Sequence, residues 1–330
     1  MNYERNIAGM KFAHPVMNVP GVNCKSLDEA VTLAESLSSG IVVGAFTKMA
    51  RSGNPGDTAY FDIPELSVNA LGMPNPGMAG LEAILPKMVK ISRAAGKPIG
   101  VNIAGFSDIE FVELAKLVED CGADWVELNL SCPNVHDGNE LFCHSLGTTE
   151  KIVRGVMGNV SIPVDVKLSP FIDIGQKEDL EASLRGLKIK ADLSECNIFE
   201  SSYAYNMAEL LRDLNVNIVT LCNTLGNVLI FKENGEPAIR TKVGDKQVLV
   251  GGMGGPIMKP IVISFVSIFR RILRPNQGIM AIGGVQRGLD VIEYECAGAD
   301  MVQASTVRAL RGERAIETII TEYVSLKESN

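Results

Sequence analysis

The chain has 330 residues, of which 46% are hydrophobic and 21% are charged, so it can build a full core and is far from the disordered class. Lys and Arg total 31 against 39 Asp and Glu, and the formal net charge of −8 argues against a nucleic-acid-binding surface, which is usually basic. The first residues contain no apolar signal core, and no stretch approaches 18 uninterrupted apolar residues. We therefore expect a cytoplasmic protein without a membrane segment.

Short apolar runs alternate with amphipathic helical segments along the chain, which is typical of folds with a parallel sheet. Eight runs are predicted to be strands: Val16–Asn18, Ile41–Thr47, Pro98–Ala104, Trp125–Asn129, Val164–Leu168, Ile218–Cys222, Ile279–Ile282 and Met301–Gln303. Helices are predicted between them, among others at Leu27–Ser38, Ile109–Asp120 and Met207–Leu214. Eight strands favour a closed barrel, so the predicted fold is a single α/β domain over residues 1–330, a (β/α)8 TIM barrel with inserted loops at its carboxyl face.

Two connections are longer than a minimal barrel requires. Residues 51–80 are rich in Gly, Pro and Asn, and we expect them to form a wall of the active site. Residues 170–217, between the fifth and sixth predicted strands, exceed the length of one helix. Within them, residues 192–201 fit either an extra strand or an irregular excursion.

Polar residues follow strand after strand at the carboxyl end, where α/β barrels place their chemistry. They are Asn18, Lys48, Asn102, Asn129, Lys167 and Asn223. Lysines are rarely buried without a partner, so Lys48 and Lys167 together indicate an anionic or electron-rich ligand. For either lysine alone, a solvated strand end explains the residue equally well.

The segment Val126–Val135 carries the most specific signal, because an apolar strand runs directly into a turn that holds Cys132 between Asn129 and Asn134. A thiol in such a place can act as a nucleophile or as a base. The asparagines suit an uncharged polar ring. The alternative is a buried structural thiol. Seven cysteines without a C-x-x-C pair indicate no metal site and reduced thiols.

Glycine clusters mark the later strand ends. Gly251–Gly255 follows the sixth strand, Ala281–Gly284 follows the seventh, and Ala304–Thr306 follows the eighth. Loops after the last strands of barrels commonly bind phosphate through backbone N–H groups. We therefore predict a phosphorylated cofactor here, with Ser305 and Thr306 as hydroxyl donors.

Over nearly its whole length the chain resembles class 1 dihydroorotate dehydrogenase, the soluble, FMN-dependent type. The motifs that carry the resemblance are Asn129–Asn134, Val68–Asn75, Val166–Pro170, Asn223–Asn227 and Gly251–Pro260. The resemblance implies FMN-dependent oxidation of (S)-dihydroorotate to orotate in de novo pyrimidine (UMP) biosynthesis. Cys132 would remove the proton from C5, and a hydride would pass from C6 to flavin N5.

The resemblance also implies roles for single residues. The substrate would be bound by Lys48, Asn69, Leu71, Gly72, Met73, Asn129, Asn134, Asn223 and Thr224. FMN would be bound by Gly21, Lys48, Asn102, Asn129, Lys167, Gly254, Gly255, Gly283, Gly284, Ser305 and Thr306. A free thiol has a pKa of about 8.5, so Cys132 would need nearby donors or Lys48 to act near neutrality. Pro20, Ala281–Ile282 and Ser305 depart from the family pattern beside the flavin.

Other functions fit part of the pattern. A dihydropyrimidine dehydrogenase-like FMN barrel would lack recognition of a substrate carboxylate, and a tRNA dihydrouridine synthase conflicts with the acidic charge. A non-catalytic flavin-binding subunit would bind FMN without turnover. Within the resembled family the electron acceptor is either fumarate, in a homodimer, or an FAD/iron–sulfur partner subunit that passes electrons to NAD, in a heterotetramer.

Overall fold

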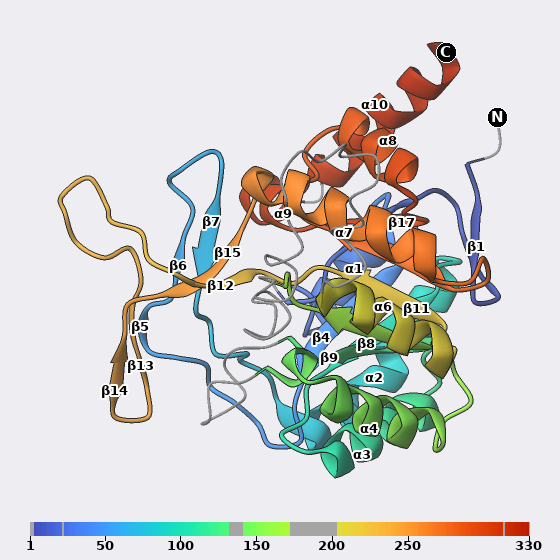
Figure 1. The fold of residues 1–330 in the computed structure, drawn as a ribbon, viewed down its shortest axis with the longest axis horizontal. Coiled ribbons are helices and arrows are strands. Elements are labelled where there is room, and N and C mark those ends of the chain that lie inside the picture. The colour runs from blue at the N-terminus through green and yellow to red at the C-terminus, as the bar shows by residue number, and fades with distance from the viewer. Residues whose placement is uncertain (1–2, 22, 132–140, 172–202, 313, 330) are drawn as a thin grey trace, which may run out of the picture.

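The centre of the molecule is a parallel sheet of eight strands with helices around it, which confirms the predicted TIM-barrel fold (Figure 1). The structure, a computed structural model, describes residues 3–21, 23–131, 141–171, 203–312 and 314–329. Neighbouring strands follow the order β3-β17-β16-β11-β10-β9-β8-β4.

Each predicted strand is present, with ends within one residue of the prediction. The barrel strands are β3 (Val16–Asn18), β4 (Ile41–Phe46), β8 (Ile99–Ile103), β9 (Trp125–Asn129), β10 (Val164–Leu168), β11 (Ile218–Leu221), β16 (Gly278–Ile282) and β17 (Met301–Ala304). The helices are α1 (Leu27–Glu35), α2 (Gly77–Ala94), α3 (Asp108–Asp120), α4 (Leu146–Met157), α6 (Tyr203–Leu214), α7 (Lys259–Ile272), α8 (Gly288–Ala297), α9 (Thr306–Arg311) and α10 (Arg314–Ser329).

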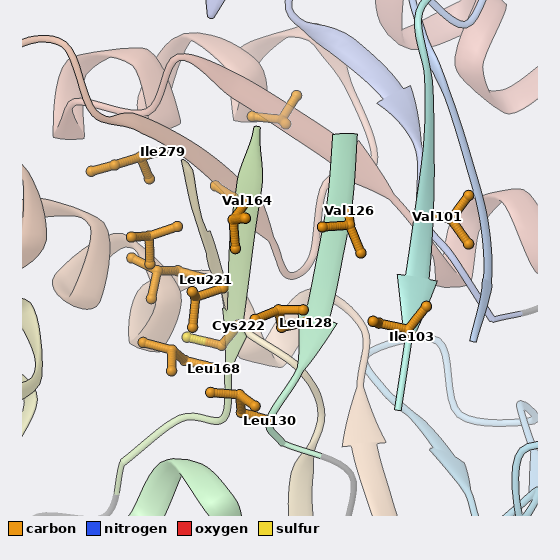
Figure 2. Close-up of a cluster of buried hydrophobic side chains, with 14 of the residues drawn as sticks. Val101, Ile103, Val126, Leu128, Leu130, Val164, Leu168, Leu221, Cys222 and Ile279 are labelled. Carbon is orange, nitrogen blue, oxygen red and sulfur yellow. The ribbon is translucent and has the colours of Figure 1, made fainter. Parts of the chain in front are cut away.

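Successive residues of a barrel strand point alternately to the barrel interior and to the surrounding helices, and this alternation decides which side chains reach the interior. Figure 2 shows Val126, Leu128 and Leu130 in the apolar cluster, together with side chains from the neighbouring strands. Because these residues face the helix layer, the intervening Glu127 and Asn129 of β9 face the interior. The same argument directs Asp165 and Lys167 of β10 inward.

The barrel is closed at one seam by a side chain rather than by a strand ladder. Asn18, at the end of β3, donates from Nδ2 to the carbonyl of Val42 at 2.8 Å and accepts from the Val42 N–H at 2.9 Å. Asn18 is fully buried and does not line the cavity described below. Its polar character at a strand end is thus explained by closure of the barrel.

The amino-terminal end of the barrel is closed by an apolar plug. A hairpin of β1 (Arg5–Ile7) and β2 (Met10–Phe12) contributes Ile7 and Phe12, which pack with Trp125 and neighbouring inward side chains. Trp125 stacks edge-on against Phe12. Polar inward residues therefore concentrate toward the opposite, carboxyl end.

Two small antiparallel sheets stand beside the barrel, at the left in Figure 1. One consists of β12 (Leu225–Val228), β15 (Gly251–Gly254), β7 (Ser67–Asn69) and β6 (Ala59–Tyr60), and the other of β14 (Lys246–Val248), β13 (Arg240–Val243) and β5 (Gly56–Asp57). Residues 51–80 thus supply strands as well as loops. The glycine cluster at 251–255 is mostly strand β15, because its backbone pairs with β7 and β12, and not a free loop directly after the sixth barrel strand.

The long connection before the sixth barrel strand is described only in part. The alternatives considered for residues 192–201 lie outside the described residues, and α6 precedes β11 as predicted. Among the helices that the structure describes, none combines the length and apolar character needed to cross a membrane.

Candidate active site

A cavity lies at the carboxyl ends of the barrel strands, between the barrel and the sheet of β7 and β15. The cavity volume that the centre of a water molecule can occupy is about 190 Å³. The barrel contributes Asn102, Asn129 and Lys167, and strands β7 and β15 contribute Asn69 and Gly254. Residues far apart in sequence therefore share one lining.

Most of the residues predicted from the sequence meet in this cavity. Its lining includes Gly21, Asn69, Leu71, Gly72, Met73, Asn102, Asn129, Lys167, Asn223, Thr224, Gly254, Gly255, Gly283, Gly284, Ser305 and Thr306. Lys48 is not part of the lining. Cys132 and Asn134 lie outside the described residues, so their roles remain predictions from the sequence.

The floor of the cavity carries a buried cation that is paired with a buried carboxylate. Lys167 Nζ lies 3.4 Å from Glu127 Oε1, and the two side chains are 5% and 0% exposed. Asn102 Nδ2 donates a hydrogen bond to the same carboxylate oxygen. Glu127 thus fixes the positions of both the cation and the amide, and both line the cavity above it.

Asn129 is oriented by its own hydrogen bonds. Its Oδ1 accepts from Ser131 Oγ at 3.0 Å and from Asn223 Nδ2 at 3.3 Å, and Asn223 Nδ2 also donates to Ser131 Oγ at 2.9 Å. Asn223 Oδ1 accepts from the Thr224 N–H at 2.9 Å. Because the carbonyl oxygen of Asn129 is engaged, the group that it offers to a ligand is its NH₂.

The antiparallel sheet forms the opposite wall. Asn69 Nδ2 donates to the carbonyl of Gly252 at 3.4 Å, so the atom of Asn69 left for a ligand is its Oδ1 acceptor. Deeper in the wall, the hydroxyls of Ser67 and Thr306 lie 2.9 Å apart. This contact joins β7 to the start of α9.

The glycines of the wall have two different reasons to be glycine. Gly255 and Gly284 have φ of +96° and +69°, and an added Cβ would lie 2.7 Å from Leu66 Cα or 2.9 Å from Pro256 Cα. The positive φ and the close packing both require glycine at these two positions. At Gly254, by contrast, a Cβ would lie 3.2 Å from Ser67 Oγ and 3.6 Å from Thr306 Oγ1. Gly254 keeps the space beside these two hydroxyls open.

Lys48 is held away from the cavity lining. Its Nζ forms an ion pair of 2.6 Å with Glu113 Oε2 on α3, and the hydrogen bond to Glu113 raises the pKa of Lys48. The side chains of Lys48 and Glu113 are 39% and 40% exposed, so this surface pair contributes little to stability. A role for Lys48 toward a ligand requires this side chain to change its partner.

Several lining residues were not predicted as site residues from the sequence, among them Lys25, Ser67 and Gln303. Lys25, before α1, donates from Nζ to the carbonyl of Pro74 at 2.9 Å, and Ser67 begins a strand that periodicity does not reveal. Gln303 ends the eighth predicted strand and faces the barrel interior. The alternation of inward and outward residues along this strand could have identified it. Its Oε1 is buried and has no hydrogen-bond partner in the described part of the chain.

The lining contains one described thiol, Cys222. Burial raises the pKa of Cys222 well above the ordinary value, and the pKa of nearby Cys143 is raised to about 12 for the same reason. Both remain neutral thiols near neutral pH, so neither serves as a base. The described residues also contain no cluster of three or more His, Cys, Asp or Glu side chains that could hold a metal ion.

These features define an α/β barrel with a polar, cofactor-type cavity at its carboxyl face. A family model described as dihydroorotate dehydrogenase matches residues 3–191 and 186–326. The chain therefore belongs to the dihydroorotate dehydrogenase family, which is a family of flavin-dependent enzymes.

Relatives of the same kind span almost the whole chain. Dihydroorotate dehydrogenase A (fumarate) of Lactococcus lactis subsp. cremoris strain MG1363 is 30% identical over 317 residues, which cover 96% of this chain and 91% of the relative. The protein of the same name from Lactococcus lactis subsp. lactis strain IL1403 is 30% identical over 327 residues, 98% of this chain and 94% of the relative. Dihydroorotate dehydrogenase (fumarate) of Trypanosoma brucei brucei is 29% identical over 310 residues, 93% and 87% of the two chains.

Proposed function

We propose that this protein oxidises (S)-dihydroorotate to orotate in pyrimidine biosynthesis, with FMN as its cofactor and fumarate as the electron acceptor. The observation that carries the proposal is one cavity that unites Lys167 and the amides Asn102 and Asn129 with the hydroxyls of Ser67 and Thr306. Membership of the dihydroorotate dehydrogenase family and the fumarate in the names of the relatives support the same reaction.

The cavity fits FMN by its chemistry. A flavin ring carries carbonyl oxygens and a ring N–H, and the floor offers the Lys167 cation, the Asn129 NH₂ and the unpaired Gln303 Oε1. The hydroxyls of Ser67 and Thr306, with the space that Gly254 leaves beside them, suit a phosphate. When bound, FMN supplies a ring system that accepts a hydride.

For the substrate, Asn69, Asn129, Asn223 and Thr224 supply amide and hydroxyl groups around the cavity, and such groups complement the imide edge of a pyrimidine ring. Cys132, next in sequence to the hydrogen-bonded Ser131, is the proposed base that takes the C5 proton. Lys48 is the proposed partner of the substrate carboxylate, after it leaves Glu113.

The acceptor follows from the relatives. Each relative named above carries fumarate in its name, so we propose that this chain passes its electrons to fumarate and not through an FAD/iron–sulfur subunit to NAD. A homodimer is the assembly that goes with this acceptor, and it remains a prediction from the sequence.

The direct test is to release the cofactor from purified protein and to assay the protein with several substrates. We expect FMN in the supernatant after denaturation and turnover of dihydroorotate with fumarate. Dihydrouracil lacks the carboxylate and should not be turned over. Released FAD, or turnover of dihydrouracil in place of dihydroorotate, would contradict the proposal.

A further inference from the structure

Two carboxyl groups face each other beneath the cavity floor. Asp165 of β10 is the register partner of Glu127 of β9, and Asn102 of β8 is the partner of Glu127 on its other side. Both acidic side chains are completely buried. Two ionised carboxylates at paired positions of adjacent strands would repel each other strongly where water is excluded.

In the described part of the chain, one oxygen of each carboxyl group receives no hydrogen bond. Glu127 Oε1 has Lys167 and Asn102 as partners, and Asp165 Oδ2 accepts from Thr220 Oγ1 at 2.7 Å. The other oxygen of each carboxyl group, Glu127 Oε2 and Asp165 Oδ1, is buried and has no partner within the described chain. One proton between the two groups would provide the donor that both oxygens lack.

The charges lead to the same arrangement. Among the described residues, the titratable groups that face Asp165 are Glu127 on β9 and Lys167 on its own strand, whereas β11 presents the neutral Thr220. Burial, and next to it the negative charge of Glu127, raise the pKa of Asp165 well above its usual range, although Lys167 acts in the opposite direction. One cation thus serves two acids, and the cluster is neutral only if one of the acids is protonated.

We propose that Asp165 and Glu127 share a single proton, and that Asp165 is thereby a positioning residue that keeps Glu127 as the counter-ion of Lys167. Asp165 does not line the cavity and acts only through Glu127 and Lys167. If Asp165 were ionised as well, Lys167 would be drawn between two anions and the cavity floor would carry a net negative charge.

The pair has a consequence for the cofactor, which rests on the proposed function. A neutral cluster leaves the positive Lys167 head group at the cavity floor balanced by one anion. An added negative charge there would lower the flavin midpoint potential, because reduction brings negative charge to the ring. Asp165→Asn removes no charge from a protonated residue, so the midpoint potential should remain that of the wild type.

The decisive experiment is infrared spectroscopy of the protein at neutral pH, which needs neither flavin nor turnover. We expect a carbonyl stretching band of a protonated carboxylic acid that is absent in Asp165→Asn. In Glu127→Gln the band should also disappear, because Lys167 then faces Asp165 as its one acid and the cluster is neutral only with Asp165 ionised. Asp57→Asn, at an exposed carboxylate paired with Lys232, is the matched control and should leave the band unchanged.

Three results would overturn the proposal: no protonated-acid band in the wild type, a band that survives Asp165→Asn, or a band that survives Glu127→Gln. If Asp165→Asn fails to fold, the loss of the band in Glu127→Gln still decides between a shared and an isolated proton. Because the bands are read on protein with or without cofactor, failure of this proposal is distinguishable from failure of the proposed function.

Discussion

At the scale of single residues, the site is defined by side chains whose free atoms are set by their neighbours. Asn129 presents its NH₂ because its Oδ1 is engaged by Ser131 and Asn223, and Asn69 presents its Oδ1 because its Nδ2 donates to Gly252. The sequence predicts which amides meet, but the atom that each presents depends on partners from other strands. The ion pair of Lys48 with Glu113 was not predictable, because it joins the residue after β4 to a helix that follows a later strand.

The first prediction concerns the proposed base. Replacing Cys132 by Ser should slow flavin reduction by dihydroorotate by about 10²- to 10⁴-fold, the usual contribution of a positioned base, and should leave FMN binding intact. Stopped-flow absorbance measures the reduction step. Cys222→Ser is the comparison, because Cys222 is a neutral thiol and its loss should spare the rate. Equal rates in wild type and Cys132→Ser would remove Cys132 from the mechanism.

The second prediction concerns Lys48. Lys48→Ala should raise the KM for dihydroorotate about tenfold or more, because a charge-assisted hydrogen bond to the carboxylate is lost. Glu113→Gln removes the competing partner and should lower the KM or leave it unchanged. An unchanged KM in Lys48→Ala would show that this lysine remains with Glu113 throughout turnover.

The third prediction is the pH dependence of stability that the buried acid pair imposes. The pKa of Asp165 is higher in the folded than in the unfolded protein, so the folded state binds the extra proton at pH values between the two. Stability relative to Asp165→Asn should therefore fall as pH rises above the unfolded value of about 3.9, by at most about 1.4 kcal/mol per pH unit. Urea unfolding of both proteins across this range measures it, and parallel pH curves would contradict it.

At the scale of elements, the barrel was predictable and the added sheets were not. Strands such as β9 and β10 are buried on both faces and read as apolar runs interrupted by single inward polar residues. Strands β5, β6, β7 and β12–β15 are two to four residues long and rich in Gly and polar residues, so no periodicity distinguishes them from loops. For this reason Gly251–Gly254 read as a loop.

The fourth prediction tests the wall of the cavity. Gly254→Ala places a methyl group beside the hydroxyls of Ser67 and Thr306 and should weaken FMN binding about tenfold or more, because it fills the proposed phosphate site. Binding of riboflavin, which has no phosphate, should change less. Gly226→Ala in β12 is the matched control, since a Cβ there meets nothing within 4 Å. Equal loss of FMN and riboflavin would place the phosphate elsewhere.

At the scale of the whole molecule, one end of the barrel is closed by apolar side chains and the other holds the cavity. The plug of Ile7, Phe12 and Trp125 fills the amino-terminal end, and Glu127 and Asp165 lie between the plug and the cavity, which Asn102 lines. Polar residues at the strand ends predicted this polarity. The pair of Glu127 and Asp165 below them depends on the register of β9 and β10, which single segments do not reveal.

The fifth prediction concerns the electron acceptor of the whole chain. Protein reduced by dihydroorotate should be reoxidised by fumarate and not by NAD, as the fumarate-named relatives suggest. The rate of return of flavin absorbance after anaerobic mixing with each acceptor gives the answer. Reoxidation by NAD alone would contradict the proposed acceptor.

The measurement that tests the proposed function most directly is anaerobic addition of L-dihydroorotate to the purified flavin-bound protein, followed at the long-wavelength flavin band. We predict that the band bleaches with one equivalent of dihydroorotate and that dihydrouracil leaves it unchanged. A flavin that stays oxidised in the presence of excess dihydroorotate would contradict the assignment of this cavity to dihydroorotate oxidation.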